Sequence, residues 1–302
     1  MEKIGLVTIT YNAESVLTSF LECVWAQTYK NFILYIVDNE STDNTLSILK
    51  NQADARLEII QNNTNLGVAA ANNQGIKKAL SDNCSQILLL NNDIEFNERL
   101  IETLYKIKKN RRCDLITPKI MYHDTPQNIW YAGGWLSKMK GYSPIHIGMR
   151  EQDKGQYDSN IEVQYAPTCC LLINRCVFEN IGFMDEKYFV YFDDTDFAYR
   201  IFVHGIHKIY YCSQIKIYHK VGSLTKSSYF KDDKVYRGDF FLHQNIKNHI
   251  YFLKKAGGLY AWLFIIWLLF KNNIRFLINP QIRKDFKTWM LINKAYFEGL
   301  LM

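Results

Sequence analysis

Apolar runs and segments of helical periodicity alternate in the first part of the chain. The apolar runs fall at residues 4–9, 32–37, 57–60 and 87–90. Strands separated by helices predict an α/β fold, with a mostly parallel sheet that helices cover on both faces. Ligands of such sheets bind at the carboxyl ends of the strands. The polar residues that follow each apolar run are therefore the first candidates for a functional site.

The pattern changes twice further along the chain. The apolar pattern becomes less regular from about Trp130, where glycine-containing stretches occur, and becomes regular again at residues 165–178. No linker rich in Pro, Gly or Ser divides residues 1–230, whereas the composition turns basic and aromatic near residue 240. The sequence therefore predicts one α/β domain over residues 1–240 and a C-terminal helical extension over residues 241–302.

The positive charge of the chain gathers in this extension. Residues 247–302 contain nine Lys or Arg and two Asp or Glu, whereas the whole chain has a formal net charge of +6. Twelve consecutive residues without charge, Leu259–Phe270, lie in the same region, where a helix that spans a bilayer needs roughly 20. We therefore expect a segment too short to cross a membrane, which lies in the interface of an anionic one. The cations that flank it are Lys254, Lys255, Lys271 and Arg275. A buried core helix or a dimer contact is the alternative.

The cysteines and the start of the chain indicate a compartment. The seven cysteines are scattered, without a CxxC spacing, which favours a reducing environment. Met1-Glu2-Lys3 lead directly into the first apolar run, and this start leaves no room for a signal peptide. We therefore expect a cytoplasmic protein.

Two polar segments follow the second and third apolar runs. Residues 37–43 read Val-Asp-Asn-Glu-Ser-Thr-Asp, so Asp38 ends a predicted strand, either as a ligand-binding group or as a helix N-cap. Residues 65–75 place small side chains at the start of a predicted helix, where phosphate groups bind favourably. The glycine spacing matches neither the dinucleotide nor the P-loop fingerprint, and tight helix packing is the alternative.

Asp93 ends the fourth predicted strand, in the run Asn91-Asn92-Asp93. A carboxylate together with substrate phosphates is the usual way to hold Mg²⁺ or Mn²⁺. The alternative is that Asp93 caps a helix that begins near Asn97. His219 follows another apolar strand and is a candidate metal ligand through its imidazole, or a structural histidine.

The densest acidic cluster is Asp193-Asp194-x-Asp196, followed by apolar residues of helical period. If the segment is helical, Asp196 and Arg200 can pair, while Asp193 and Asp194 point in different directions. Crowded carboxylates raise the pKa of one of them, which suits a general base. A solvated acidic turn is the alternative.

Taken together and in this order, the segments resemble the inverting family 2 glycosyltransferases of the GT-A fold, in particular the rhamnosyltransferase-like branch. The resemblance runs from about Lys3 to Lys255. It rests on Thr10-Tyr11-Asn12, residues 37–43 and 65–75, Asn91-Asn92-Asp93, Trp130-Tyr131-Ala132-Gly133-Gly134, Cys170-Leu171-Leu172-Ile173 with Arg175, Phe192-Asp193-Asp194-x-Asp196-Phe197 and His219-x-x-Gly222-Ser223.

The resemblance implies a role for each of these motifs. Asp194 matches the family's catalytic base, with Asp193 as the other candidate, and Asp93 matches the last residue of its metal-binding DxD motif, with His219 nearby. Only one carboxylate remains in that motif, so Mn²⁺ or Mg²⁺ affinity could depend on His219. The residues implied in binding the nucleotide are Thr10, Tyr11, Asn12, Asp38, Asn39, Asn65, Gly67, Ala71, Asn72 and Asn92.

The implied reaction is transfer of a sugar from a nucleotide diphosphate donor, by a single displacement that inverts the configuration. The branch favours dTDP-rhamnose, with UDP-sugars behind it. The basic aromatic extension favours a lipid-linked oligosaccharide of a bacterial surface polysaccharide as acceptor, at the inner face of the cell membrane, and a homodimer stays open. Nucleic acid is not an expected partner, because the basic residues surround an apolar stretch.

Two other functions compete with this interpretation. A nucleotidyltransferase would need a basic glycine-rich loop near the N-terminus, and residues 10–16 contain no Lys or Arg. A non-catalytic nucleotide-sugar binding or scaffold protein on the same fold is the second rival, and the incomplete DxD motif motivates it.

Overall fold

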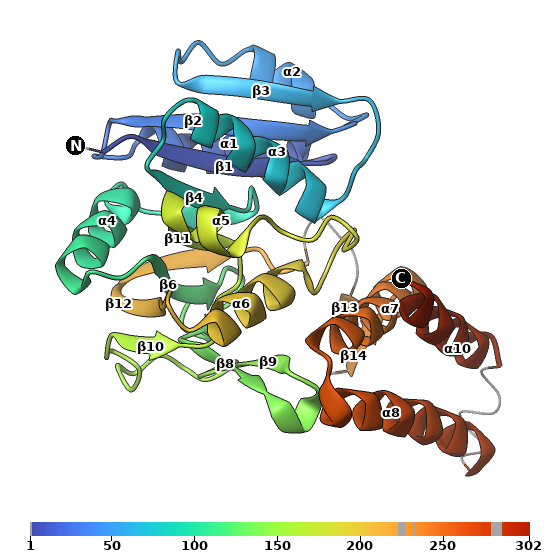
Figure 1. The fold of residues 1–302 in the computed structure, drawn as a ribbon. Coiled ribbons are helices and arrows are strands. Elements are labelled where there is room, and N and C mark those ends of the chain that lie inside the picture. The colour runs from blue at the N-terminus through green and yellow to red at the C-terminus, as the bar shows by residue number, and fades with distance from the viewer. Residues whose placement is uncertain (1, 223–227, 232–233, 279–285) are drawn as a thin grey trace.

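The parallel strands come first in the chain, as predicted from the alternating pattern. A computed structural model describes residues 2–222, 228–231, 234–278 and 286–302 (Figure 1). Within the sheet, β1 (Ile4–Thr10) lies between β2 (Phe32–Asn39) and β4 (Gln86–Leu90), and β3 (Leu57–Asn62) forms the edge beside β2. All of these neighbours pair in parallel.

The second half of the sheet mixes directions. The strand β11 (Cys170–Asn174) pairs antiparallel with both β4 and β6 (Leu115–Tyr122), while β12 (Ile209–His219) pairs in parallel with β6. Short strands extend this half or form separate hairpins. They are β5 (Ile94–Phe96), β7 (Ile129–Tyr131), β8 (Gly134–Ser137), β9 (Ser143–His146), β10 (Ile161–Val163), β13 (Ser228–Lys231) and β14 (Lys234–Arg237).

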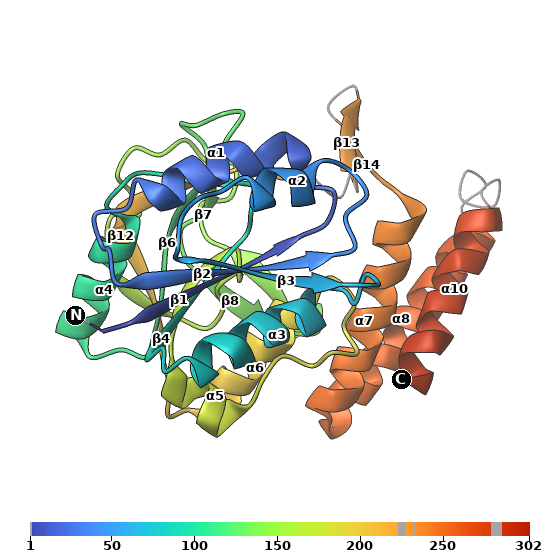
Figure 2. The same ribbon diagram turned by 90° about the horizontal axis from the view of Figure 1, so that it is seen from above.

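Helices cover both faces of the sheet (Figure 2). The helices α1 (Glu14–Trp25) and α2 (Thr45–Lys50) lie on one face, and α3 (Val68–Ser81), α5 (Arg175–Ile181) and α6 (Asp193–His204) lie on the other. A further helix, α4 (Leu100–Arg111), packs against β6 and β12. The buried side chains recur at helical spacing, as they do along α1 at Val16, Leu17, Phe20, Leu21 and Val24.

In the described part of the C-terminal region, the helices are α7 (Asp239–Ala256), α8 (Gly258–Ile278) and α10 (Phe286–Leu301). The first of them packs directly on the α/β domain. Asn248 of α7 is buried and donates hydrogen bonds to the carbonyls of Val190 and Tyr191 at 2.8 and 2.9 Å. The boundary near residue 240 therefore separates segments that share a packed interface, and independent folding of the two parts stays a prediction.

The structure corrects two expectations for the extension. The helix α8 has 21 residues and continues past Lys271, so by length and composition it is long enough to cross a membrane, and the inference that it is too short is wrong. Most of its apolar side chains are exposed, so it is not a buried core helix. The exposed ones are Leu259, Trp262, Leu263, Ile266, Trp267, Phe270, Ile274, Leu277 and Ile278.

Two of the four flanking cations face the protein. Lys255 pairs with Asp185 at 2.5 Å and with Asp196 at 2.7 Å, and Lys254 donates to the carbonyl of Leu300 at 2.8 Å. These lysines therefore contribute to packing within the chain, and contact of the flanking cations with a membrane stays a prediction.

The β8–β9 hairpin joins the α/β domain to α8. At the tip of the hairpin, Tyr260 of α8 donates a hydrogen bond to the carbonyl of Lys138, and Gly141 lies against Phe264 of α8. A Cβ atom on Gly141 would come within 2.5 Å of the Phe264 ring, and its φ of 62° also favours glycine. The tip therefore fits closely against the start of α8.

A buried ion cluster fixes the long loop that precedes β10. Lys119 of β6 is fully buried and pairs with Asp153 at 3.0 Å and Asp158 at 2.5 Å. Burial opposes the ionisation of Asp153, but hydrogen bonds from Lys216 and Lys119 outweigh it and lower the pKa of Asp153 to about 2. The stabilisation from this carboxylate is present above its ordinary pKa and is lost as the pH falls toward 2.

Replacing Lys119 by Met should lower the free energy of unfolding by about 3 kcal/mol, because Asp153 would keep its buried charge with one partner fewer. Urea unfolding at neutral pH measures this difference. Lys208→Met is the matched control, because its pair with Glu162 is about half exposed and should contribute less than about 1 kcal/mol. If both substitutions lowered the free energy of unfolding equally, the stabilising role of the buried Lys119 ion cluster would be contradicted.

Candidate functional site

The carboxyl ends of β1, β2 and β4 meet where the strand order reverses, with β2 and β4 on opposite sides of β1. Ligands of open α/β sheets bind in the crevice at this point. In both views β2 and β3 end on the side of the molecule that also carries α7 and the β13–β14 hairpin (Figures 1 and 2). Thr10, Asp38 and Asp93 all lie at this edge, at the ends of three neighbouring strands.

Asp38 is fully buried near the carboxyl end of β2. Its carboxylate accepts hydrogen bonds from the Thr10 hydroxyl at 2.8 Å, the Ser41 amide at 3.0 Å and the Ser41 hydroxyl at 2.6 Å. The N-cap alternative is wrong, because α2 begins at Thr45 and has Asn44 at its N-cap. Asp38 thus shapes the loop after β2, and its contact with a nucleotide stays a prediction.

Tyr11 and Asn12 form the loop after β1. Asn12 has a φ of 50° and accepts a hydrogen bond from the Thr42 amide at 2.8 Å, so the loops after β1 and β2 are tied together. The Tyr11 side chain is 48% exposed, and its ring is available to stack on a base.

The start of α3 favours the packing alternative for Gly67. A Cβ atom there would lie 2.4 Å from the carbonyl oxygen of Phe189, and the φ of 84° also favours glycine. Asn65 accepts from the Gly67 amide at 3.0 Å, and Asn39 donates to the Gly67 carbonyl at 3.1 Å. The group that comes close to Gly67 is therefore the carbonyl of Phe189 in the same chain.

The remaining predicted nucleotide-binding residues differ in their surroundings. Ala71 is fully buried and Asn72 nearly so. Asn92 donates to the carbonyl of Ile9 at 2.8 Å and so ties the end of β4 to β1. For these three residues, contact with a nucleotide also stays a prediction.

Asp93 and His219 lie together although they are far apart in the sequence. The Oδ1 atom of Asp93 is 3.3 Å from Nε2 of His219. Antiparallel pairing places His219 opposite Ile94, and the Lys220 amide donates to the carbonyl of Asp93 at 2.9 Å. The helix-cap alternative for Asp93 is wrong, because α4 begins at Leu100 with Arg99 at its N-cap.

The donor set of this pair fits a divalent cation. It offers one carboxylate and one imidazole, and Mn²⁺ accepts both types of ligand. Nδ1 of His219 is buried and has no hydrogen-bond partner among the residues that the structure describes. The end of the predicted His219 motif, Ser223, lies outside those residues.

The acidic segment begins α6. Asp193 and Asp196 are buried, so the alternative of a solvated acidic turn is wrong. The predicted pairing of Asp196 with Arg200 is present at 2.8 Å, and Lys255 adds a second ion pair. Asp196 is therefore engaged in packing the helix.

The two adjacent carboxyl groups have different environments. Burial and the neighbouring charge of Asp194 raise the pKa of Asp193 well above its ordinary value. Asp194 is partly exposed and accepts a hydrogen bond of 2.6 Å from the hydroxyl of Tyr165. Tyr191 and Phe192 have φ values of 67° and 68°, a conformation that costs energy in residues other than glycine and that recurs at functional sites.

A row of aromatic and histidine rings links Asp194 to His219. The His146 ring stacks on Tyr165 at 5.6 Å and meets Trp130 edge to face at 4.7 Å, and Trp130 meets His219 at 4.9 Å. Burial lowers the pKa of His146, although a hydrogen bond with the carbonyl of Trp130 and the charge of Asp194 oppose the change.

Sequence reasoning missed Tyr165 and His146. Neither belongs to a motif, and the only signal was the tighter apolar pattern that starts at residue 165. The structure thus places Asp93 and His219 at one end of the ring row and Asp194 at the other.

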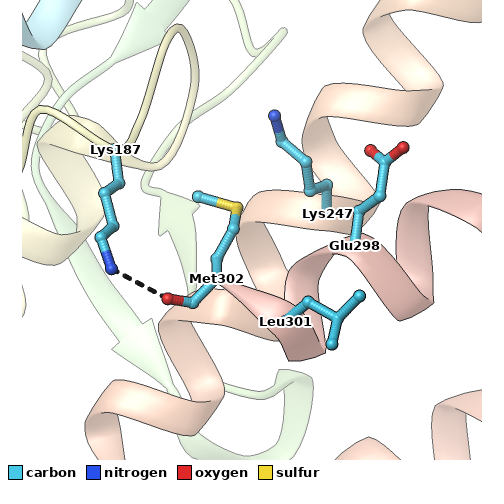
Figure 3. Close-up of a pocket in the computed structure, with 5 residues that line it drawn as sticks. All are labelled: Lys187, Lys247, Glu298, Leu301 and Met302. Atoms are coloured by element: carbon cyan, nitrogen blue, oxygen red, sulfur yellow. Dashed lines mark hydrogen bonds between the residues drawn. The ribbon is translucent and has the colours of Figure 1, made fainter.

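A cavity of about 600 Å³ lies elsewhere, between the C-terminal helices and Lys187 (Figure 3). Lys187 donates to the carbonyl of Met302 at 2.9 Å across it. Lys247, Glu298 and Leu301 also line this cavity, whose walls carry both signs of charge. No predicted site residue lines it, so the residues at the carboxyl ends of β1, β2 and β4 remain the candidate site.

Comparison with protein families finds one domain model. A model described as Glycosyl transferase family 2 matches residues 6–182, which are more than half of the chain.

Curated relatives are similar over part of the chain. The low-salt glycan biosynthesis hexosyltransferase Agl10 of Haloferax volcanii is 29% identical over 153 residues, 48% of this chain and 46% of the relative. The dTDP-rhamnosyl transferase RfbF of Shigella flexneri is 23% identical over 217 residues, 72% of this chain and 68% of the relative. The UDP-Glc:alpha-D-GlcNAc-diphosphoundecaprenol beta-1,3-glucosyltransferase WfaP of Escherichia coli is 35% identical over 79 residues, 26% of this chain and 32% of the relative. The chain spans about half the length of the first of these relatives.

Solved structures share the fold. S. aureus TarS 1-349 in complex with UDP-GlcNAc has a TM-score of 0.61 at 16% identity, over 98% of this chain and 81% of that TarS fragment. The mannosyltransferase PcManGT from Pyrobaculum calidifontis in complex with GDP-Man and Mn²⁺ has a TM-score of 0.59 at 13% identity, over 99% of this chain and 87% of PcManGT. The predicted fold class is confirmed.

Replacing Asp193 by Asn should change how stability depends on pH. Because the pKa of Asp193 is raised, the folded protein keeps a proton that the unfolded chain releases, and wild-type stability falls as the pH rises between the two pKa values. The amide does not ionise, so Asp193→Asn should gain stability relative to the wild type from about pH 5 to about pH 8. Thermal unfolding at a series of pH values measures the gap. Glu22 is exposed, and the control variant Glu22→Gln should follow the wild-type curve. If the Asp193→Asn curve ran parallel to the wild-type curve, a raised pKa of Asp193 would be ruled out.

Proposed function

Because this chain belongs to glycosyl transferase family 2, we propose that it transfers a sugar from a nucleotide diphosphate donor to an acceptor hydroxyl with inversion of configuration. The family that the sequence motifs indicated is confirmed by the domain match. The observation that carries the proposed reaction is the row of rings between Asp194 and the Asp93–His219 pair. It separates a group that can accept a proton from a pair that can hold a cation.

In the proposed reaction, Asp194 removes the proton of the acceptor hydroxyl while that oxygen attacks the anomeric carbon. The bond from this carbon to the diphosphate oxygen breaks on the opposite face of the sugar, so the configuration inverts. Asp194 is favoured over Asp193 because its carboxylate is partly exposed, whereas Asp193 is buried. A general base placed in this way contributes about 10²–10⁴-fold to the rate.

Tyr165 and His146 would orient the base. The hydrogen bond of 2.6 Å from Tyr165 fixes one carboxylate oxygen of Asp194, and the stacked ring of His146 fixes Tyr165. The other carboxylate oxygen accepts only from Thr195 among the contacts of the described residues, at 3.1 Å, and can turn toward an acceptor.

Asp93 and His219 would hold the cation that the family resemblance implies. Mn²⁺ or Mg²⁺ bound there would neutralise the charge that develops on the departing diphosphate. With a single carboxylate at Asn91-Asn92-Asp93, the site needs the donor's phosphate oxygens to complete it. His219 would supply the second protein ligand.

For the donor we propose dTDP-rhamnose, with UDP-sugars as the next candidates. The relative RfbF, a dTDP-rhamnosyl transferase, matches most of this chain, although at 23% identity. The nucleotide would lie on the loops after β1 and β2, with its base on Tyr11 and its phosphates toward Asp93. Thr10, Asn12 and Asp38 would hold these two loops in position beneath the nucleotide.

For the acceptor we propose a lipid-linked saccharide at the cytoplasmic face of the cell membrane. The name of WfaP specifies a diphosphoundecaprenol-linked acceptor. In this chain, the exposed apolar side of α8 fits an apolar environment, and Lys271 lies over the ring of Trp267 at 4.4 Å, where it can meet anionic headgroups. The 21 residues of α8 allow it to lie in the interface or to insert more deeply.

Asp194→Asn should lose donor turnover about 10²–10⁴-fold and keep donor binding. The measurement is release of sugar from a panel of dTDP- and UDP-sugars, with Mn²⁺, with Mg²⁺ and with EDTA, beside calorimetric donor binding. Release from one donor that needs the metal would identify the sugar. The neighbouring variant Asp193→Asn should lose far less turnover, and equal losses would exclude Asp194 as the specific base. Donor binding without release, even with lipid-linked acceptors, would instead favour the binding-protein alternative.

Leu263→Glu combined with Ile266→Glu should weaken binding to vesicles that contain anionic lipid. Each substitution removes an apolar side chain worth about 1.5–3 kcal/mol when buried, so affinity should fall at least tenfold. Co-sedimentation with vesicles with and without anionic lipid measures the loss. Val203→Glu, an exposed apolar position on α6, is the matched control. Unchanged binding of the α8 variant would exclude this surface.

A further inference from the structure

A second cavity lies at the opposite edge of the sheet from the candidate active site. Its volume is about 230 Å³, and it is bordered by the start of β4 and by the segment between α4 and β6. This is the edge where the parallel strands begin, whereas Asp93 lies where they end. The lining residues are Glu2, Gln86, Tyr105, Lys108, Lys109, Arg112, Cys113, Asp114 and Asn174.

Lys108 is an unpaired cation in the wall of this cavity. The residue is only 5% exposed, and within the described part of the chain its ammonium group has no hydrogen bond or ion pair, although the charges of Asp114 and Glu2 act on it from a greater distance. Burying a charge without a partner is costly, and burial accordingly lowers the pKa of Lys108. A partner inside the cavity would remove this cost.

The nearby carboxylates are engaged with other groups. Glu2 accepts from the Gln86 amide at 2.8 Å and from Ser85 at 3.0 Å. Asp114 lies 2.8 Å from Nδ1 of His207 and accepts from the Cys176 thiol at 3.7 Å. Neither carboxylate forms an ion pair with Lys108 in the part of the chain that the structure describes.

Gln86 supplies a second unsatisfied group. Its side-chain oxygen is buried and has no hydrogen-bond partner among the described residues. The cavity wall therefore presents a cationic donor at Lys108 and a neutral acceptor at Gln86. Lys109 and Arg112 add two exposed cations at the same cavity.

We propose that this cavity binds a small phosphate-type oxyanion. Phosphate oxygens would accept hydrogen bonds from Lys108, with Arg112 and Lys109 at the mouth, and the hydroxyl of a protonated phosphate would donate to Gln86. The volume exceeds that of a single water, about 30 Å³, and is smaller than pockets for drug-sized ligands, about 300–1,000 Å³. Inorganic phosphate and the phosphate end of a small metabolite share this chemistry.

The test is thermal unfolding of the full chain with increasing inorganic phosphate, at constant ionic strength and with EDTA. EDTA prevents phosphate from binding through a metal at Asp93, and no sugar donor is present, so the result does not depend on the proposed transferase activity. The wild type should show a saturable rise in Tm of roughly 3 °C or more. Glycerol phosphate in a parallel titration distinguishes the two sources, because a larger rise with it indicates a phosphomonoester.

Lys108→Met should abolish the rise. Without phosphate, this variant should melt at or above the wild-type temperature, because it lacks the unpaired charge. Lys106→Met is the matched control, because Lys106 lies on the same helix, is exposed and pairs with Glu102 away from the cavity. An equal rise in Lys108→Met, no saturable rise with either anion, or a crystal structure grown with phosphate that holds only water in the cavity would overturn the proposal.

Discussion

The antiparallel pairing of β5 with the end of β12 is the contact on which the candidate site depends. It brings His219 beside Asp93, which lie in distant parts of the sequence, and the backbone bond from Lys220 to Asp93 fixes their spacing. Each backbone group at this edge of the sheet needs a partner, so the two side chains cannot separate without breaking sheet hydrogen bonds. The fold therefore preorganises the pair before any ligand arrives.

A second constraint joins the C-terminal helices to the acidic segment. Lys255 of α7 pairs with Asp185 and Asp196, which lie on either side of the turn that contains Tyr191 and Phe192. Both residues of this turn have left-handed backbone conformations, and packing on α7 offsets their cost. Phe192 stacks on His249 of α7 at 5.0 Å, so the position of Asp194 depends on a helix outside the matched family domain.

The sequence predicted the elements whose signals are local. The apolar runs located the parallel strands, and the polar residues after them located Asp38 and Asp93 at the strand ends, because the edge of a parallel sheet follows from strand direction. Tyr165 and His146 were missed because they come from irregular segments and meet only through tertiary folding. The charge-free run underestimated the length of α8, since a helix continues through a lysine that extends along its surface. The role of Lys255 could not be predicted from composition, because its ion-pair partners lie some 60–70 residues earlier.

The β8–β9 hairpin spans from α8 to the row of rings. Its tip touches Tyr260 and Phe264, and its last residue is His146, which stacks beside Tyr165. A strand of four residues is about 13 Å long. If α8 rests on a bilayer, the length of the hairpin determines the distance of Asp194 from the lipid surface. Acceptors would then be selected by the length of their saccharide as well as by its chemistry, because only a hydroxyl at that distance reaches the base.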